Sequence, residues 1–146
     1  MRNWRYLVPV LLALHCAWAA AGSLQLREGY VREMPSGQST SAAYMKLFNG
    51  GSAPVAIVAA LCDCAQTTAI EMLHRSGGAL HLQRVRRLEI PAHGSVLLTP
   101  SSYRLTLINL KRTLRAGESV RITLLDEEGK AYSGQIPVVK MLGTVR

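Results

Sequence analysis

The chain has 146 residues and a formal net charge of +8 at neutral pH. This length suffices for one domain with its own hydrophobic core and is too short for two. The charge does not indicate a nucleic-acid-binding protein, because the densest basic patch (Arg84, Arg86 and Arg87) has no aromatic residues interleaved with it.

The first 21 residues have the three parts of a secretory signal peptide. Residues 1–5 are basic, residues 6–14 are apolar but too few to span a bilayer, and small residues follow around two Ala-x-Ala cleavage sites. We therefore predict a signal peptide over residues 1–21 and a single domain over residues 22–146. The processed protein is expected in the periplasm, without stable insertion into the membrane.

Cys16 lies at the end of this segment and raises the alternative of a lipid-anchored protein. A lipid-attachment motif places leucine and a small residue ahead of the cysteine, whereas Ala13 and His15 occupy the deciding positions here. We therefore expect Cys16 to be removed with the signal peptide.

Short strand-like segments follow, separated by turn residues, and no helix of ordinary length is evident. The segments are residues 24–32, 41–49, 55–61, 66–74, 79–85, 95–99, 103–108, 120–125 and 131–139. Glycine, proline, asparagine and serine fill the gaps between them, as they do in turns. Many short strands at this spacing predict an antiparallel β-sandwich or barrel.

One predicted hairpin gathers Met72, His74 and His81, whose side chains suit soft or borderline metals, copper above all. If Ser76-Gly77 form the centre of the turn, Met72 faces His81; if Gly77-Gly78 do, His74 faces His81. In both registers the three residues share one face, because side chains alternate along a strand. A second interpretation places Met72 in the core and leaves the histidines as exposed residues of an ordinary hairpin.

Cys62 and Cys64 are the cysteines that remain after signal cleavage. A disulfide between them would close a very small loop, contribute little stability, and be reduced more easily than a structural bridge. Two thiolates at this spacing can instead bind Cu(I), and an inert buried pair is the third interpretation. The spacing is not the Cys-x-x-Cys of thiol oxidoreductases. No set of nucleophile, base and orienting residue is present elsewhere, so we predict no enzymatic activity.

The order of several short segments resembles the PCuAC family of periplasmic copper chaperones over residues 30–138. The segments are Val31-Arg32 with Pro35 and Gly37, Ala42-Ala43-Tyr44-Met45 before Asn49, Ile70-Glu71-Met72, Leu88-Glu89-Ile90-Pro91-Ala92 with Gly94, Tyr103 with Leu105, Leu110-Lys111, and Leu114 with Gly117. The resemblance implies a cupredoxin-like (Ig-like) β-sandwich. It also implies exposed histidine and methionine ligands for Cu(I), and delivery of the ion to a copper-accepting protein such as cytochrome oxidase.

The metal motif of that family is His-x-Met, a further methionine downstream, and a later His-x-Met. By this resemblance Ile70 replaces the first histidine and Met72 retains its methionine. His81 falls at or beside the next methionine, while Arg104 and Thr106 replace the final pair. Arg104 places a fixed cation where the family binds one.

The sequence therefore predicts a periplasmic copper-binding protein or copper chaperone, with copper as Cu(I). The candidate ligands are Met72, His74, His81, Cys62 and Cys64. One alternative is a metal-free β-sandwich module that presents its arginines to an acidic partner protein. The other is a thiol-redox protein that uses the two cysteines.

Overall fold

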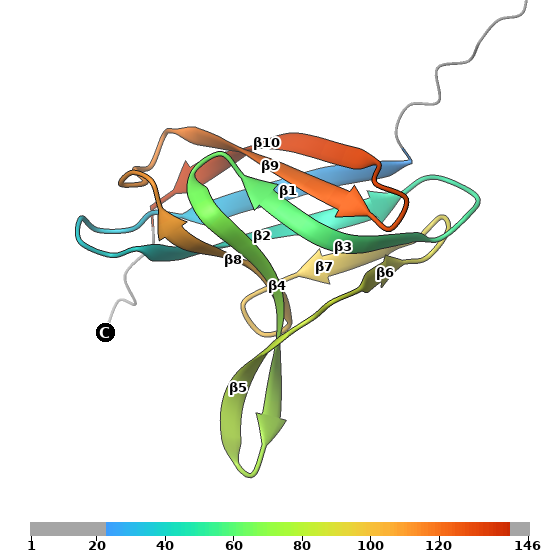
Figure 1. Ribbon diagram of the computed structural model, residues 1–146, viewed down its shortest axis with the longest axis horizontal. Coiled ribbons are helices and arrows are strands. Elements are labelled where there is room, and N and C mark those ends of the chain that lie inside the picture. Colours follow the sequence, from blue (N-terminus) through green and yellow to red (C-terminus); the bar gives the residue numbers. More distant parts are fainter. Residues whose placement is uncertain (1–22, 141–146) are drawn as a thin grey trace, which may run out of the picture.

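A computed structural model describes residues 23–140, in which ten β-strands and no helix occur (Figure 1). The predicted signal peptide, with Cys16, lies outside the described residues. The strands are β1 (Leu24–Arg32), β2 (Thr40–Asn49), β3 (Val55–Cys62), β4 (Ala65–Ser76), β5 (Ala79–Arg84), β6 (Leu88–Ile90), β7 (Ser95–Leu98), β8 (Tyr103–Leu110), β9 (Ser119–Asp126) and β10 (Ala131–Val139).

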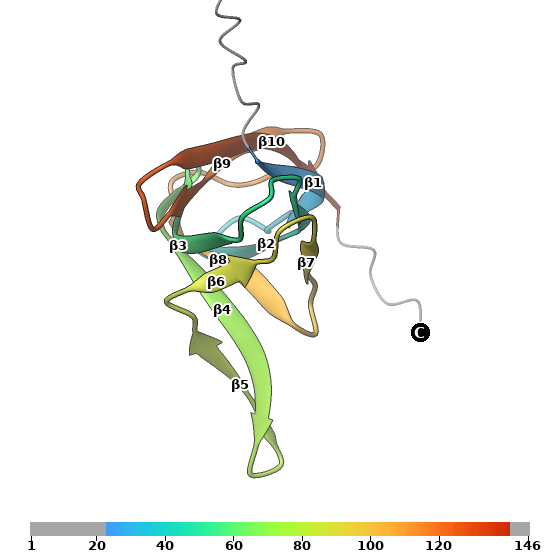
Figure 2. The same cartoon turned by 90° about the vertical axis from the view of Figure 1, so that its right-hand side faces the viewer.

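The strands form one sheet that closes on itself. Their hydrogen-bonded order is β5-β4-β8-β7-β2-β1-β10-β9-β3-β6, and additional pairings join β4 to β3 and β8 to β2. Figure 2 shows most of the strands arranged around a common centre, with β4 and β5 extending away from it. The predicted all-β class is confirmed. The expectation of purely antiparallel pairing is wrong at two places, because β1 pairs with β10, and β7 with β8, in parallel.

The core fills the inside of this closed sheet. Along β2, β8 and β9, every second side chain points inward, as the two-residue repeat of a strand requires. Residues of this set are at most 2% exposed: Ala43, Met45, Leu47, Leu105, Leu107, Val120, Ile122 and Leu124. The alternate residues of the same strands face away from this core.

All nine predicted strands are present, and their ends differ from the prediction by at most two residues. The strand that sequence analysis missed is β6, whose three residues pair with the start of β3. Leu88 and Ile90 of this strand are buried, while Glu89 is exposed. One apolar–polar–apolar repeat is too short to distinguish a strand from a loop.

Asp126 organises the turn between β9 and β10. Its carboxylate accepts hydrogen bonds from the backbone N–H of Glu128 (3.0 Å) and Lys130 (2.8 Å), and from the hydroxyl of Tyr132 (3.0 Å). Burial by itself would raise the pKa of this carboxyl group. The hydrogen bonds from Lys130, Tyr132 and Glu128 outweigh burial, so the pKa of Asp126 is lowered from its usual value of 3.8.

We predict that the domain loses stability in acid through this turn. A carboxyl group with a lowered pKa in the folded state stabilises the fold fully above its unfolded pKa, and this contribution disappears as the pH falls through the folded value. Urea unfolding at pH 7 and pH 3 should show a smaller pH effect in Asp126→Asn than in the wild-type protein. Glu118→Gln, at an exposed ion pair, is the control; an equal pH effect in wild type and Asp126→Asn would contradict the prediction.

Candidate metal centre on the β4–β5 hairpin

The β4–β5 hairpin projects from the closed sheet as an arm (Figures 1 and 2). β4 is 12 residues long; its first part pairs with β8, and from Glu71 onward it also pairs with β5. The pairing of Ser76 with Ala79 makes Gly77 and Gly78 the central turn residues, with φ angles of 59° and 80°. Glycine adopts such angles without steric cost, which is why this sequence turns here.

This turn decides between the two predicted registers in favour of the one in which His74 faces His81. Their ring centroids are 5.9 Å apart, with an angle of 42° between the ring planes. Met72 lies two residues before His74 on the same face of β4, opposite Gln83. We call Met72, His74 and His81 the His/Met face.

The His/Met face has an unused ligand atom. His74 is half-buried, and its Nδ1 is shielded from solvent with no hydrogen-bond partner in the described part of the chain. His81 is exposed, and Met72 is partly buried. Two imidazoles on neighbouring strands can turn a nitrogen toward one ion, and a thioether beside them adds a soft donor.

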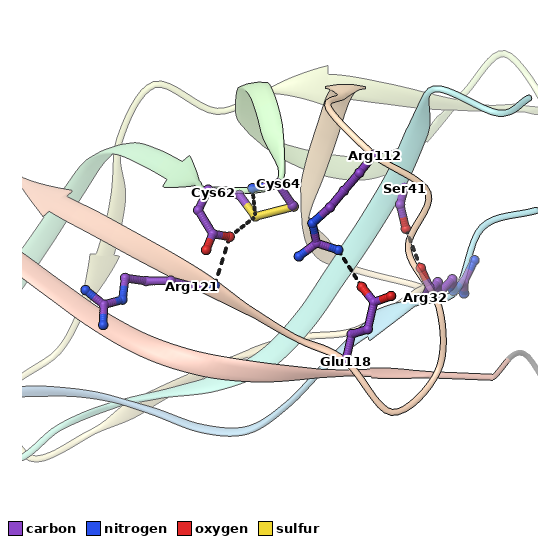
Figure 3. Close-up of a disulfide and its surroundings, with 8 residues drawn as sticks. Arg32, Ser41, Cys62, Cys64, Arg112, Glu118 and Arg121 are labelled. Carbon is purple, nitrogen blue, oxygen red and sulfur yellow. Dashed lines mark hydrogen bonds and ion pairs between the residues drawn. A yellow bond between two sulfur atoms is a disulfide. The ribbon is translucent and has the colours of Figure 1, made fainter. Parts of the chain in front are cut away.

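Cys62 and Cys64 flank the turn between β3 and β4 and form a disulfide, with Cα atoms 5.2 Å apart (Figure 3). Both are buried, at 7% and 1% exposure. The exposed carboxylate of Asp63 lies between them in sequence and accepts a hydrogen bond from the backbone N–H of Arg121 at 3.1 Å. The potential ligand atoms of these three residues all lie within 4.8 Å of one another.

The structure does not bring the cysteines to the His/Met face. Cys64 precedes β4 and Met72 lies in its second half, so Met72 is eight steps further along the strand, roughly 26 Å at about 3.3 Å a step. Figure 1 shows the β3–β4 turn and the tip of the arm at opposite ends of β4. The five predicted ligands therefore form two separate groups.

Glu71 is the residue of β4 that faces Arg104, whereas Ile70, which the resemblance aligns with the first histidine of the family motif, lies on the opposite side of the strand. Ile70 pairs with Leu105 and is 4% exposed, so it belongs to the core. Glu71 pairs with Arg104, and the hydroxyl of Thr106 donates a hydrogen bond to a carboxylate oxygen of Glu71 at 2.5 Å. Partners across two strands share a face, so Glu71, Arg104 and Thr106 stand together on one side of the sheet.

Arg104 fills this outer position as part of a cationic stack on Tyr44. Its guanidinium carbon lies 5.9 Å from the centre of the Tyr44 ring, and that of Arg32 lies 5.0 Å from the same ring. The Arg104 side chain also donates a hydrogen bond to the carbonyl oxygen of Pro100 at 3.0 Å. Two fixed positive charges on one ring make this surface unfavourable for a bare metal cation.

Comparison with known proteins identifies the family. A family model described as "Putative lipoprotein LpqE-like" matches residues 24–138. The chain belongs to the LpqE-like family. The sequence of this LpqE-like protein is 27% identical, over 124 residues, to "Putative lipoprotein Lxx21020" of Leifsonia xyli subsp. xyli; the match covers 84% of this chain and 74% of the relative.

Solved structures share the fold of the LpqE-like chain. The apo PCuAC domain of PmoF1 superimposes with a TM-score of 0.69 at 18% identity, over 82% of this chain and 95% of that domain. Apo-DR1885 of Deinococcus radiodurans superimposes with a TM-score of 0.65 at 29% identity, over 97% of this chain and 95% of that protein. The predicted resemblance to PCuAC domains is confirmed. Within residues 23–140 no helix is long and apolar enough to cross a membrane.

We predict that the surface formed by Glu71, Arg104 and Thr106 becomes a copper site when these residues are replaced by the ligand types of the PCuAC motif. The variant Glu71→His/Arg104→His/Thr106→Met removes the fixed cation and supplies two imidazoles and a thioether on adjacent strands. It should bind at least one more equivalent of Cu(I) than the wild-type protein in an anaerobic titration. Arg104→Gln/Thr106→Ala, which removes the charge without adding ligands, is the control. Equal stoichiometry in the triple variant and wild type would refute the prediction.

Proposed function

We propose that this LpqE-like protein binds Cu(I) in the periplasm on its His/Met face and passes it to a copper-accepting protein. The observation that carries the proposal is the in-register pair of His74 and His81, with ring centroids 5.9 Å apart, on an arm that projects from the domain. A Cu(I) form of DR1885 has been solved and shares the fold with a TM-score of 0.59 at 29% identity.

The chemistry of the face suits transfer of the ion more than its storage. Imidazole and thioether are ligands that favour copper, and Cu(I) accepts a small number of them. The exposed His81 can exchange with an incoming ligand while His74 holds the ion. Since imidazole binds metal only in its neutral form, the affinity should fall in acid. The PCuAC resemblance implies that the recipient is cytochrome oxidase during its assembly. We propose no enzymatic activity.

A second candidate site is the Cys62–Asp63–Cys64 cluster, favoured by the proximity of its ligand atoms. The disulfide must first be reduced: a dithiol reductant supplies two electrons and two protons and becomes a disulfide itself, leaving two thiols. These thiols then release their protons as Cu(I) binds. Copper binding at the cluster would thus depend on the reducing power of the compartment.

The third candidate, a metal-free module for an acidic partner, draws support from Arg104 and from the exposed Arg84 and Arg86. Arg87 is a poorer member of that basic patch than the sequence suggests, because it forms ion pairs with Glu89 (2.8 Å) and Glu127 (3.2 Å). This function becomes the leading one if Cu(I) does not bind.

We predict that the oxidised protein binds one Cu(I) and that His74→Ala/His81→Ala weakens binding at least tenfold. Loss of a partner that merely orients a metal ligand costs roughly 10–100-fold in affinity, so loss of two ligands should cost no less. The measurement is an anaerobic titration against a competing Cu(I) chelator. Met72→Leu, which keeps the volume and removes the thioether, should weaken binding to a smaller extent.

His93→Asn provides the matched control for the histidine variants. His93 is exposed in the turn after β6 and has a φ of 54°, which asparagine tolerates better than most residues. The His93→Asn variant should bind copper as the wild type does. Unchanged affinity in His74→Ala/His81→Ala would exclude the His/Met face.

We predict that Cys62→Ser/Cys64→Ser leaves this first equivalent of Cu(I) unchanged, because the cysteines lie far from the histidines. Reduction of the wild-type protein should add a second, cysteine-dependent equivalent that the double serine variant lacks. Thiol quantification before each titration defines the redox state. Binding in wild type and none in the serine variant would move the functional site to the cysteine cluster.

A further inference from the structure

The arm has a second face with a different chemistry. The register pairs Leu73 with Leu82 and Arg75 with Leu80, on the side of the hairpin opposite to His74 and His81. Arg84, opposite Glu71, continues the same side toward the body of the domain. We call these residues the Leu/Arg face: Leu73, Arg75, Leu80, Leu82 and Arg84.

Two of the three leucines of this face are open to solvent. Leu80 is 57% exposed and Leu82 is 48% exposed, and every residue of β5 is exposed. β5 is the end strand of the sheet order, with β4 as its partner, and the arm extends away from the other strands (Figures 1 and 2). Apolar side chains gathered at the end of a projecting element, with no described residue packed over them, mark an interaction site.

The charge around these leucines has one sign. Residues 72–86 contain Arg75, Arg84 and Arg86 and no aspartate or glutamate. The ion pairs among the described residues use Arg87 and Arg112, so none of the three arginines of the arm forms one there. Glu71, at the base of the arm, bonds to Thr106 and stands in register between Arg84 and Arg104.

We propose that the Leu/Arg face seats the domain on an anionic lipid surface. Leu80 and Leu82 enter the interface between headgroups and acyl chains, while Arg75 and Arg84 bind lipid phosphates. Arginine suits this position because its stem lies along apolar groups and its guanidinium reaches the headgroup level. Each basic residue near an anionic surface strengthens attachment.

Charge complementarity favours lipid over the other possible occupants. A second copy of the chain would bring two arginine-bearing faces together without acids to pair them. A protein partner would need an apolar groove rimmed by acids and shaped to the arm. A lipid surface offers negative charge and apolar depth together and requires no matching shape. The His/Met face, on the other side of the hairpin, stays turned away from the lipid.

The test is flotation of residues 22–146, which contain the whole closed sheet, with vesicles of phosphatidylglycerol and phosphatidylcholine or of phosphatidylcholine alone. The protein should float with the anionic vesicles and much less with the neutral ones. Two variants test the face separately: Leu80→Ser/Leu82→Ser and Arg75→Gln/Arg84→Gln. Each should partition at least about tenfold more weakly, with copper affinity unchanged, so the outcome is independent of the copper proposal.

The matched controls make the same changes elsewhere on the surface. Leu61→Ser alters a leucine that is 54% exposed on β3, and Arg115→Gln/Arg121→Gln removes two exposed arginines; both should float like wild type. The proposal is overturned if the protein ignores anionic vesicles, or if the controls lose binding as much as the arm variants do. It is also overturned if the arm variants abolish a dimer or binding to an acidic polypeptide while vesicle binding is unaffected.

Discussion

The simultaneous pairing of β4 with β8 and β5 determines where every candidate ligand of the arm lies. Met72 is opposite Tyr103 on one side and Gln83 on the other. Partners across strands share a face, so Ile70, Met72 and His74 belong to one side of the strand and Glu71, Leu73 and Arg75 to the other. A slip of one residue would exchange the two sets, and the buried Ile70 and Leu105 prevent it by fixing the register from the core.

This register separates two chemistries that would oppose each other on a single surface. Arginines close to a metal site raise the free energy of the bound cation, and the effect grows as water is excluded. Here Arg75, Arg84 and Arg104 are on the side opposite to His74 and His81. The backbone of a two-stranded arm thus supports a basic surface and a proposed cation site at once.

Local patterns in the sequence predicted the strands and the turn of the arm, because alternation and glycine act over a few residues. The parallel pairing of β1 with β10 and the pairing of β3 with β9 join segments far apart in the chain, and no local pattern encodes them. The disulfide between Cys62 and Cys64 was one of three interpretations, since spacing does not define a redox state. The resemblance aligned Ile70 with the first histidine of the family motif from sequence order alone, and only the register shows that Ile70 lies on the side of β4 opposite to Arg104 and Thr106.

Glu71 and Arg104 also show why fold and metal site must be argued separately in this family. The strands that carry the PCuAC motif are kept, with Glu71 and Arg104 in register across β4 and β8. Yet Glu71 accepts a hydrogen bond from the hydroxyl of Thr106, and Arg104 donates one to the carbonyl oxygen of Pro100. A shared fold keeps the backbone positions at which ligands could stand, whereas the side chains decide the chemistry. In this protein Met72 and His74 stand on the side of β4 opposite to Glu71, and a copper site there would combine the retained methionine with two histidines on the same scaffold.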